Sequence, residues 1–286
     1  MRTGIPAFAR TTLAERRRGT RDSGFARLRP AAFGPAPARL RVAGALAAML
    51  ALALTASVLF ASGARSGEAQ TVTFAARDGV MVTGALLLPD KTPAPAVLLL
   101  PMMSRTLHDF DAVSARLAES GIAALAIDFR RNGSPRAAGT ASDGSDNGDL
   151  GDLVLDAEAA RAYLSARPEL AGRRVGVLGA SLGANVAVLV AGNDATMSSL
   201  ALLSASLEYR SLRMEYALRK YGSRPALLVA SSEDPYALRS ARQAVTMGDG
   251  PRELRVLSGA GHGTVMLSRD PDLISALVDW FQRTLL

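Results

Sequence analysis

Short apolar runs alternate with longer segments of helical periodicity along most of this chain. The runs predict strands at residues 71–74, 80–88, 96–100, 122–127, 175–178, 199–203, 226–230 and 253–257. Stripes of apolar residues at helical spacing predict helices at residues 110–117, 150–164, 182–190, 214–221, 235–247 and 273–281. Because strand and helix alternate from Ala96 onward, the pattern predicts an α/β fold, a mostly parallel eight-stranded sheet with helices on both faces.

The first 64 residues follow a different pattern. Residues 1–41 are rich in arginine, alanine, proline and glycine without sustained apolar periodicity, so we expect a disordered cytoplasmic tail. Residues 42–61 carry no charge and match the ~20 apolar residues that cross a bilayer as a helix. The arginines before this stretch favour an N-terminus in the cytoplasm and a body outside it. We therefore expect residues 42–64 to form a transmembrane or signal-anchor segment.

Small residues at the end of this segment leave a second possibility open. The sequence Ala61-Ser-Gly-Ala64 could be cut by a signal peptidase. Cleavage near Ala64 would give a secreted or periplasmic protein, whereas an uncleaved segment would hold the protein on the cytoplasmic membrane. In both cases we expect residues 65–286 to form one α/β domain outside the cytoplasm.

The charge of the chain belongs mainly to its tail. A net charge of +7 and a pI near 10.4 suggest nucleic-acid binding at first. Residues 1–41, however, hold ten of the 33 basic residues and only two of the 26 acidic ones. The body is therefore close to neutral, and we expect no nucleic-acid partner. With no cysteine and only two histidines, the sequence excludes disulfides and thiol nucleophiles, and we expect neither a metal nor a cofactor.

One stretch carries a clear signal for chemistry. The segment from Val175 to Gly183 reads as a strand, then Gly179-Ala-Ser181-Leu-Gly183, and an apolar helix follows. This order is the context that a nucleophile elbow requires. The glycines leave room for the neighbouring backbone, and the Ser181 hydroxyl comes to the N-terminus of a helix, where developing negative charge is favoured. We therefore expect Ser181 to be a catalytic nucleophile, the alternative being an incidental helix N-cap.

A base and an acid follow at suitable positions. His262 lies in a glycine-rich loop directly after the last predicted strand, and an imidazole has the pKa needed to take a proton from serine. Asp234 also follows a strand and could orient that imidazole, although an aspartate before Pro235 is an ordinary helix N-cap as well. Ser181, Asp234 and His262 are thus the predicted catalytic residues. His108, near the start of a helix, is expected at the wall of the pocket.

With these pieces in order, residues 71–286 resemble the α/β-hydrolase superfamily, nearest to its small dienelactone-hydrolase-like and esterase branches. The run 96–100 followed by Pro101-Met-Met103 is similar to the family's strand and oxyanion turn. The segment 128–134, Asp-Phe-Arg-Arg-Asn-Gly-Ser, resembles a further family stretch. The resemblance implies an oxyanion hole formed by the backbone N–H groups of Leu182 and Met103. Met102 is the alternative donor and a pocket residue.

The resemblance also carries two departures. The family often has His-Gly at the oxyanion turn, where this chain has Pro101-Met102, which makes the pocket more apolar. Residues 204–225 leave no room for the lid domain of larger relatives, so we expect no lid domain and an open cleft.

The function expected from the sequence is hydrolysis of carboxylic esters by a serine hydrolase. The substrate would be a small-molecule ester, cleaved through an acyl-enzyme without a cofactor. Alternatives are an amide, peptide or lipid-derived ester as substrate, or a non-catalytic, membrane-tethered binding module on the same fold. The oligomeric state and the acyl and alcohol parts of the substrate stay open.

Overall fold

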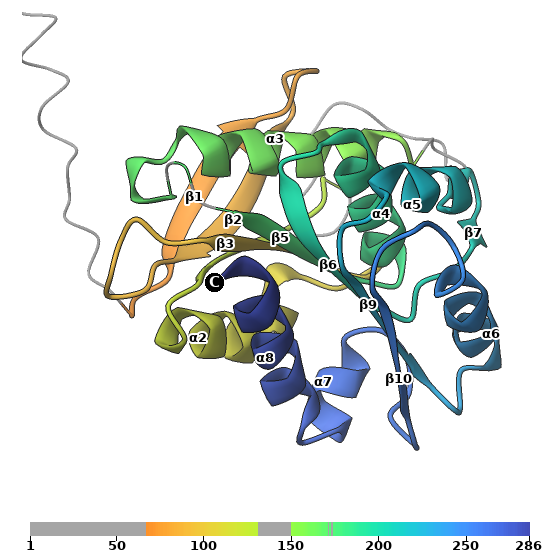
Figure 1. Cartoon of the computed structure of the whole chain (residues 1–286). Coiled ribbons are helices and arrows are strands. Elements are labelled where there is room, and N and C mark those ends of the chain that lie inside the picture. Colours follow the sequence, from red (N-terminus) through yellow and green to blue (C-terminus); the bar gives the residue numbers. More distant parts are fainter. Residues whose placement is uncertain (1–66, 131–149, 171, 173) are drawn as a thin grey trace, which may run out of the picture. The chain divides into compact units, whose positions relative to one another are not determined.

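The computed structural model describes residues 67–130, 150–170, 172 and 174–286. Their core is an eight-stranded sheet in the order β1-β2-β4-β3-β5-β6-β9-β10 (Figure 1). The strands are β1 (Gln70–Ala75), β2 (Met81–Leu87), β3 (Ala96–Leu100), β4 (Ala123–Ile127), β5 (Val175–Ala180), β6 (Met197–Leu203), β9 (Ala226–Ser231) and β10 (Arg252–Leu257). Only β2 runs against its neighbours, β1 and β4. The predicted mostly parallel eight-stranded sheet is therefore confirmed.

Helices cover both faces of this sheet (Figure 1). They are the 3₁₀ turns η1 (Leu107–Phe110) and η2 (Pro168–Leu170) and the α-helices α2 (Asp111–Glu119), α3 (Asp152–Ala166), α4 (Leu182–Asn193), α5 (Glu215–Tyr221), α6 (Pro235–Ala244), α7 (Val265–Arg269) and α8 (Leu273–Leu285). Helices α3 to α6 pack in one apolar cluster and α2, α7 and α8 in a second.

Strand β3 is apolar throughout because both of its faces are buried. Its side chains alternate between the two clusters: Leu98 and Leu100 join the first, whereas Val97 and Leu99 join the second. All five residues of the strand are buried, as expected for a parallel strand covered on both faces. The sequence boundaries of this strand and the observed ones agree.

Three features depart from the predicted elements. The helix expected at residues 235–247 ends at Ala244. Helix α7 and a two-stranded hairpin, β7 (Glu208–Tyr209) and β8 (Leu212–Arg213), were not predicted. Strands of two residues are too short to show a periodicity, and this hairpin is held by a distant side chain. The buried Asn185 of α4 donates to the carbonyl oxygens of Ser206 and Leu212, at 2.8 and 3.1 Å.

The N-terminal expectations fall outside the described residues. The tail at 1–41, the segment at 42–64 and the proposed cleavage site near Ala64 lie before residue 67. Among the residues that are described, no helix combines the length and apolar character needed to cross a bilayer.

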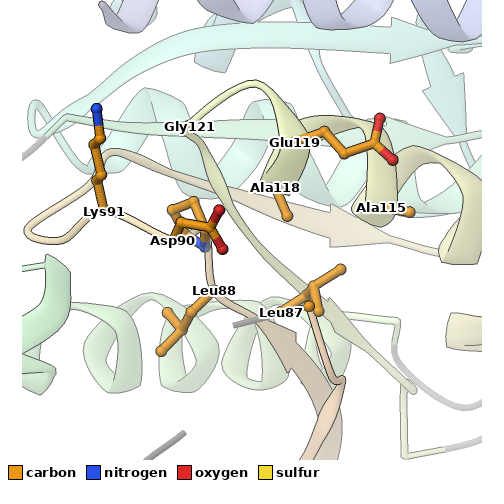
Figure 2. A pocket seen from close by; sticks show the side chains of 10 residues that line it. Leu87, Leu88, Asp90, Lys91, Ala115, Ala118, Glu119 and Gly121 are labelled. Atoms are coloured by element: carbon orange, nitrogen blue, oxygen red, sulfur yellow. The ribbon is translucent and has the colours of Figure 1, made fainter. Parts of the chain in front are cut away.

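The amino ends of the parallel strands carry features that are separate from the predicted catalytic residues. A hollow of about 400 Å³ lies beside Leu87 and Leu88 at the end of β2, with Ala118 and Glu119 of α2 on its wall (Figure 2). Leu87 pairs with Ala124 at the start of β4, so the hollow lies at the edge opposite the carboxyl ends of the parallel strands.

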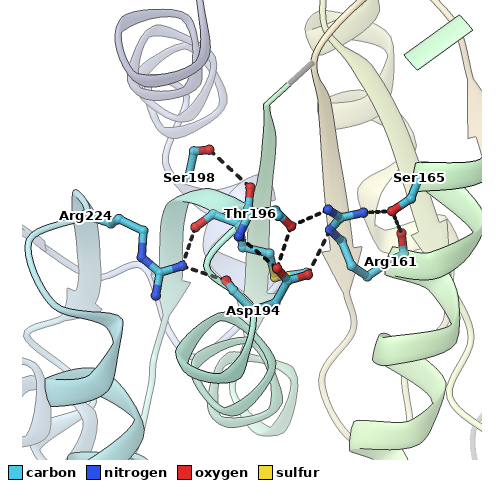
Figure 3. A network of polar contacts seen from close by, with 7 residues as sticks. Arg161, Ser165, Asp194, Thr196, Ser198 and Arg224 are labelled. Carbon is cyan, nitrogen blue, oxygen red and sulfur yellow. Dashed lines mark hydrogen bonds and ion pairs between the residues drawn. The ribbon is translucent and has the colours of Figure 1, made fainter. Parts of the chain in front are cut away.

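A polar network ties the start of β6 to its surroundings (Figure 3). Arg161 of α3 contacts the Asp194 carboxylate at 3.2 Å and donates to the Thr196 hydroxyl. From the other side, Arg224 donates to the carbonyl oxygens of Asp194 and Met197, both at 2.7 Å. These contacts join α3, the end of α4 and the segment before β9.

Candidate active site

The turn between β5 and α4 places Ser181 in a constrained backbone conformation. Ser181 has φ 51° and ψ −116°, a region that residues other than glycine rarely adopt. Its N–H donates to the carbonyl of Leu203 on β6 at 2.8 Å. A Cβ on Gly179 would lie 2.2 Å from the Gly183 carbonyl oxygen, so the crossing of strand and helix requires glycine there. The turn therefore has the geometry that the sequence motif predicted.

The structure brings together the three side chains that the sequence singled out. His262 Nε2 lies 2.7 Å from Ser181 Oγ, and His262 Nδ1 lies 2.5 Å from Asp234 Oδ2. Because an ionised carboxylate can only accept, a neutral imidazole donates from Nδ1 to Asp234 and accepts at Nε2 from the serine hydroxyl. This is the arrangement in which the imidazole can remove the Ser181 proton.

Asp234 serves two partners at once. While Oδ2 faces His262, Oδ1 accepts the N–H of Ala237 at 3.1 Å and caps the N-terminus of α6. The helix cap and the orienting carboxylate, which the sequence left as alternatives, are therefore compatible contacts of one side chain. The neighbouring Glu233 is exposed. The cap fixes the Asp234 carboxylate, and the N-terminus of α6 favours its negative charge.

Three glycines shape the loop that carries His262. Gly259, Gly261 and Gly263 have φ values of 67°, 80° and 59°, which glycine tolerates and other residues rarely do. This backbone returns the chain from the end of β10 toward the end of β5. The glycines allow the path, but they do not by themselves fix the position of the imidazole.

Two buried serine hydroxyls hold this loop on either side of His262. The N–H of Ala260 donates to Ser231 Oγ at 3.1 Å, and the N–H of Gly263 donates to Ser204 Oγ at 3.0 Å. Both serines stand at the carboxyl ends of parallel strands and have no exposed surface. Neither serine was predicted from the sequence as a site residue. The sequence feature that could have indicated them is a serine directly after an apolar run, because ligands bind beyond the carboxyl ends of the strands in such sheets.

The oxyanion turn predicted after β3 lies directly against α4. A Cβ on Gly183 would lie 2.3 Å from the carbonyl oxygen of Leu100 and 2.5 Å from that of Pro101. The start of α4 and the turn from Pro101 to Met103 are therefore in backbone contact. Leu182 is the first residue of its helix, so its N–H has no acceptor within the helix.

The two methionines of this turn take different directions. Met102 lies against the His262 loop: its sulfur would be 2.7 Å from a Cβ on Gly263, and it lies 3.3 Å from the Thr264 hydroxyl oxygen. Met103 instead faces the β7–β8 hairpin, where the Tyr209 hydroxyl lies 3.7 Å from its sulfur. Both methionines are partly buried, and Met102 and the Ser181 Cβ both lie within 4 Å of the Cβ position of Gly263.

His108, which the sequence predicted at the wall of the pocket, lies in the 3₁₀ turn η1. Its side chain is 76% exposed and its Nδ1 lies 3.2 Å from Asp111 on the next turn. The contact with the catalytic loop comes from its neighbour Asp109, whose carboxylate accepts the hydroxyl of Thr264. Arg105 also donates to Asp109, at 2.8 Å. A role for His108 toward substrate stays a prediction without a contact to support it.

An ion-pair group follows the end of β4, in the stretch 128–130. The buried Asp156 of α3 accepts from the backbone N–H and the Nε of Arg130, at 3.0 and 2.9 Å. Arg130 also donates to Asp78, at 2.5 Å. Burial raises the pKa of the Asp156 carboxyl, while the hydrogen bonds from Arg130 oppose that rise. The same arginine lowers the pKa of Asp78. This group binds the chain after β4 to α3.

No cluster of three or more histidine, cysteine, aspartate or glutamate side chains in the described residues is suited to hold a metal ion.

A comparison with protein families matches residues 82–284 to the Dienelactone hydrolase family. No significant match was found among curated proteins.

Several solved structures have a similar fold. The dienelactone hydrolase from Anabaena variabilis is 19% identical, with a TM-score of 0.62 over 77% of this chain and 99% of that one. The esterase domain of a Rhodothermus marinus protein is 21% identical, with a TM-score of 0.57 over 76% and 99%. A Pyrococcus furiosus esterase is 17% identical, with a TM-score of 0.60 over 77% and 92%. At these identities the structural likeness establishes the fold.

Proposed function

The chain belongs to the dienelactone hydrolase family, and we propose that it hydrolyses small carboxylic esters through an acyl-enzyme formed on Ser181. The observation that carries this proposal is the continuous contact from Ser181 Oγ through His262 to Asp234, at 2.7 and 2.5 Å. The match to a hydrolase family across most of the domain supports the same reaction class.

The first half of the reaction forms the acyl-enzyme. His262 Nε2 takes the proton of the Ser181 hydroxyl while Oγ attacks the ester carbonyl carbon. Asp234 accepts from Nδ1 throughout, which holds the tautomer and stabilises the imidazolium that results. The imidazolium then gives its proton to the alkoxide that leaves, so the alcohol departs neutral and the acyl group remains on Ser181.

The negative charge on the carbonyl oxygen needs donors that are already in place. The backbone N–H of Leu182, at the start of α4, and that of Met103 are our candidates, with the N–H of Met102 as the alternative. The close approach of Gly183 to the Leu100 and Pro101 carbonyls supports this pairing, because it holds the two backbone segments together. Such preorganised donors stabilise an oxyanion better than water does.

The second half releases the acid. Water enters beside His262, which is 45% exposed, and gives a proton to Nε2 as its oxygen attacks the acyl carbon. The tetrahedral intermediate collapses, the imidazolium returns the proton to Ser181 Oγ, and the carboxylic acid leaves. Every proton is carried by His262, so this route requires no cofactor.

Hydrolysis of a series of p-nitrophenyl esters by the full-length chain tests the proposal. We expect turnover of short-chain esters by the wild type and by Ser120→Ala, which removes one hydroxyl at the end of α2. Ser181→Ala is expected to lose that turnover. Wild-type protein that is folded but hydrolyses no ester would contradict the proposal.

Assays of the same full-length chain distinguish the proposed ester hydrolase from other functions of this site. Matched p-nitroanilides test amide substrates, and long-chain esters presented on vesicles test lipid esters. A non-catalytic, membrane-tethered binding module would leave every substrate intact, and a Ser181→Ala chain would then still replace the wild type in cells. The intact contacts among Ser181, His262 and Asp234 favour the enzyme.

We further propose that this domain works outside the cytoplasm, tethered by residues 42–64 or released after cleavage near Ala64. The uncharged stretch at 42–61 and the arginines before it support this location. Fractionation of cells that express the full chain, with N-terminal sequencing of the product, tests it. An intact N-terminus in the cytoplasmic fraction would contradict the proposal.

A further inference from the structure

We propose that Ser204 is a positioning residue for His262, acting through the backbone N–H of Gly263. Its hydroxyl oxygen accepts that N–H at 3.0 Å, one residue after the imidazole. Ser204 follows the last residue of β6 and has no exposed surface. The inference rests on the proposed function, since it concerns how the base of that reaction is held.

The backbone conformation of Ser204 favours glycine, so the serine side chain calls for a separate explanation. Its φ is 51°, in the left-handed region that favours glycine. Its N–H is already paired with the carbonyl of Val229 at 2.9 Å, so the sheet edge holds this conformation. A glycine would adopt it with less strain. What serine adds at this position is the buried acceptor for Gly263.

A second hydroxyl completes the support. Ser231, at the end of the neighbouring strand β9, accepts the N–H of Ala260 at 3.1 Å. It also accepts the N–H of Glu233 at 3.3 Å, next to the Asp234 that faces the imidazole. The loop is thus tied to the sheet on both sides of His262, and one tie also reaches the segment that supplies the acid.

The need for these ties follows from the geometry of the imidazole. It must meet Ser181 at 2.7 Å and Asp234 at 2.5 Å at the same time, while it stands between glycines with left-handed backbones. Glycine backbones have the greatest conformational freedom of any residue. Fixing the neighbouring N–H groups to buried hydroxyls removes that freedom, and errors of about 1 Å at a reacting group cost about 100-fold in rate.

The variant that separates positioning from folding is Ser204→Gly, because it removes the hydroxyl and relieves the strained φ. We expect its kcat for p-nitrophenyl esters to fall about 10- to 100-fold with little change in KM or thermal midpoint. Ser199→Ala is the matched control, since Ser199 lies in β6, the strand that Ser204 directly follows, is equally buried and accepts from the Thr284 hydroxyl at 2.7 Å. This control should lower the thermal midpoint and leave kcat unchanged.

A second comparison asks whether Ser204 acts through the imidazole. In a His262→Ala background, Ser204→Gly should cause no further loss of residual turnover. If Ser204→Gly does not fold, Ser204→Ala takes its place in the same comparisons. Alanine keeps the Cβ atom of serine and lacks only the hydroxyl. A kcat equal to that of wild type, or an equal loss in the His262→Ala background, would overturn the proposal.

Hydrogen exchange at residues 261–264 of the full-length chain provides a readout that needs no catalysis. Loss of the Ser204 hydroxyl should speed exchange of the Gly263 amide, whereas the Ser199→Ala control should not. Faster exchange in a protein that hydrolyses no ester would support the tie and contradict the proposed function. Unchanged exchange in an active protein would overturn the tie and leave the function intact.

Discussion

Gly183 and Leu100 approach so closely that only a residue without a side chain fits at position 183. A Cβ there would lie 2.3 Å from the Leu100 carbonyl oxygen. This contact presses the start of α4 against the turn that follows β3. This one backbone contact therefore fixes Leu182 relative to the turn at Met103. These two residues are the expected donors to the oxyanion.

Gly183→Ala should consequently damage both stability and catalysis. The added methyl group must push the turn away from α4, because the atoms it meets belong to the backbone. We expect a lower thermal midpoint and a large fall in kcat. Gly121→Ala is the control: its φ of 83° makes the substitution strained, but no atom lies within 4 Å of the new Cβ. It should cost about 1 kcal/mol of stability and leave kcat unchanged.

Asp234 allows its two contacts to be separated by substitution. Asp234→Asn keeps an oxygen to cap α6 but removes the carboxylate that orients His262 and stabilises the imidazolium. We expect kcat to fall about 10,000-fold with a nearly unchanged thermal midpoint. Asp234→Ala should lose about 1 kcal/mol of stability in addition, because the N–H of Ala237 loses its cap. A Glu233→Gln control should behave as wild type; equal activity of Asp234→Asn and wild type would refute the assigned role.

The buried ion pair behind β4 predicts a stability effect away from the catalytic contacts. Asp156→Ala leaves the guanidinium of Arg130, 11% exposed, without its buried partner. Removing one member of a buried pair should lower the free energy of unfolding by about 3 kcal/mol, measured by denaturant unfolding. Glu215→Ala breaks an exposed pair with Arg219 and should cost less than about 1 kcal/mol. Equal losses in the two variants would contradict this assignment.

The pH dependence of stability should change when Asp78 is replaced. Arg130 lowers the pKa of Asp78 below its ordinary value of 3.8. An acid with a depressed pKa in the folded state contributes stability above its unfolded-state pKa, and that contribution is lost as the pH falls through the folded-state pKa. We therefore expect the difference in thermal midpoint between wild type and Asp78→Asn to shrink from about pH 7 to about pH 3. A constant difference would be inconsistent with the ion pair.

Much of the fold could be predicted from the sequence because the central strands β3, β4, β5 and β9 are buried on both faces. The run at 96–100 has no polar residue and is bounded by prolines, so its boundaries matched the observed β3. Ser181, Asp234 and His262 follow predicted strands and stand within two residues of a glycine or proline, and the structure brings them into contact as predicted. Patterns of this kind can be recognised from neighbouring residues alone, without knowledge of distant contacts.

The missed features depend on residues far apart in the chain. Ser204 meets Gly263, 59 residues later, and neither residue carries a pattern that names the other. The β7–β8 hairpin is held by Asn185, which precedes it by about twenty residues inside an apolar helix. Contacts of this sort become visible only when the strands are placed side by side.

The proposed reaction depends on activation of Ser181 as a nucleophile by His262 and Asp234. Its most direct test is labelling of the full-length chain by a fluorophosphonate, with the modified residue located by mass spectrometry. We predict rapid labelling of wild type on Ser181 and its loss in Ser181→Ala and His262→Ala, with all three proteins folded by thermal unfolding. Folded wild type that stays unlabelled, or Ser181→Ala labelled as fast as wild type, would show that Ser181 is not the activated nucleophile.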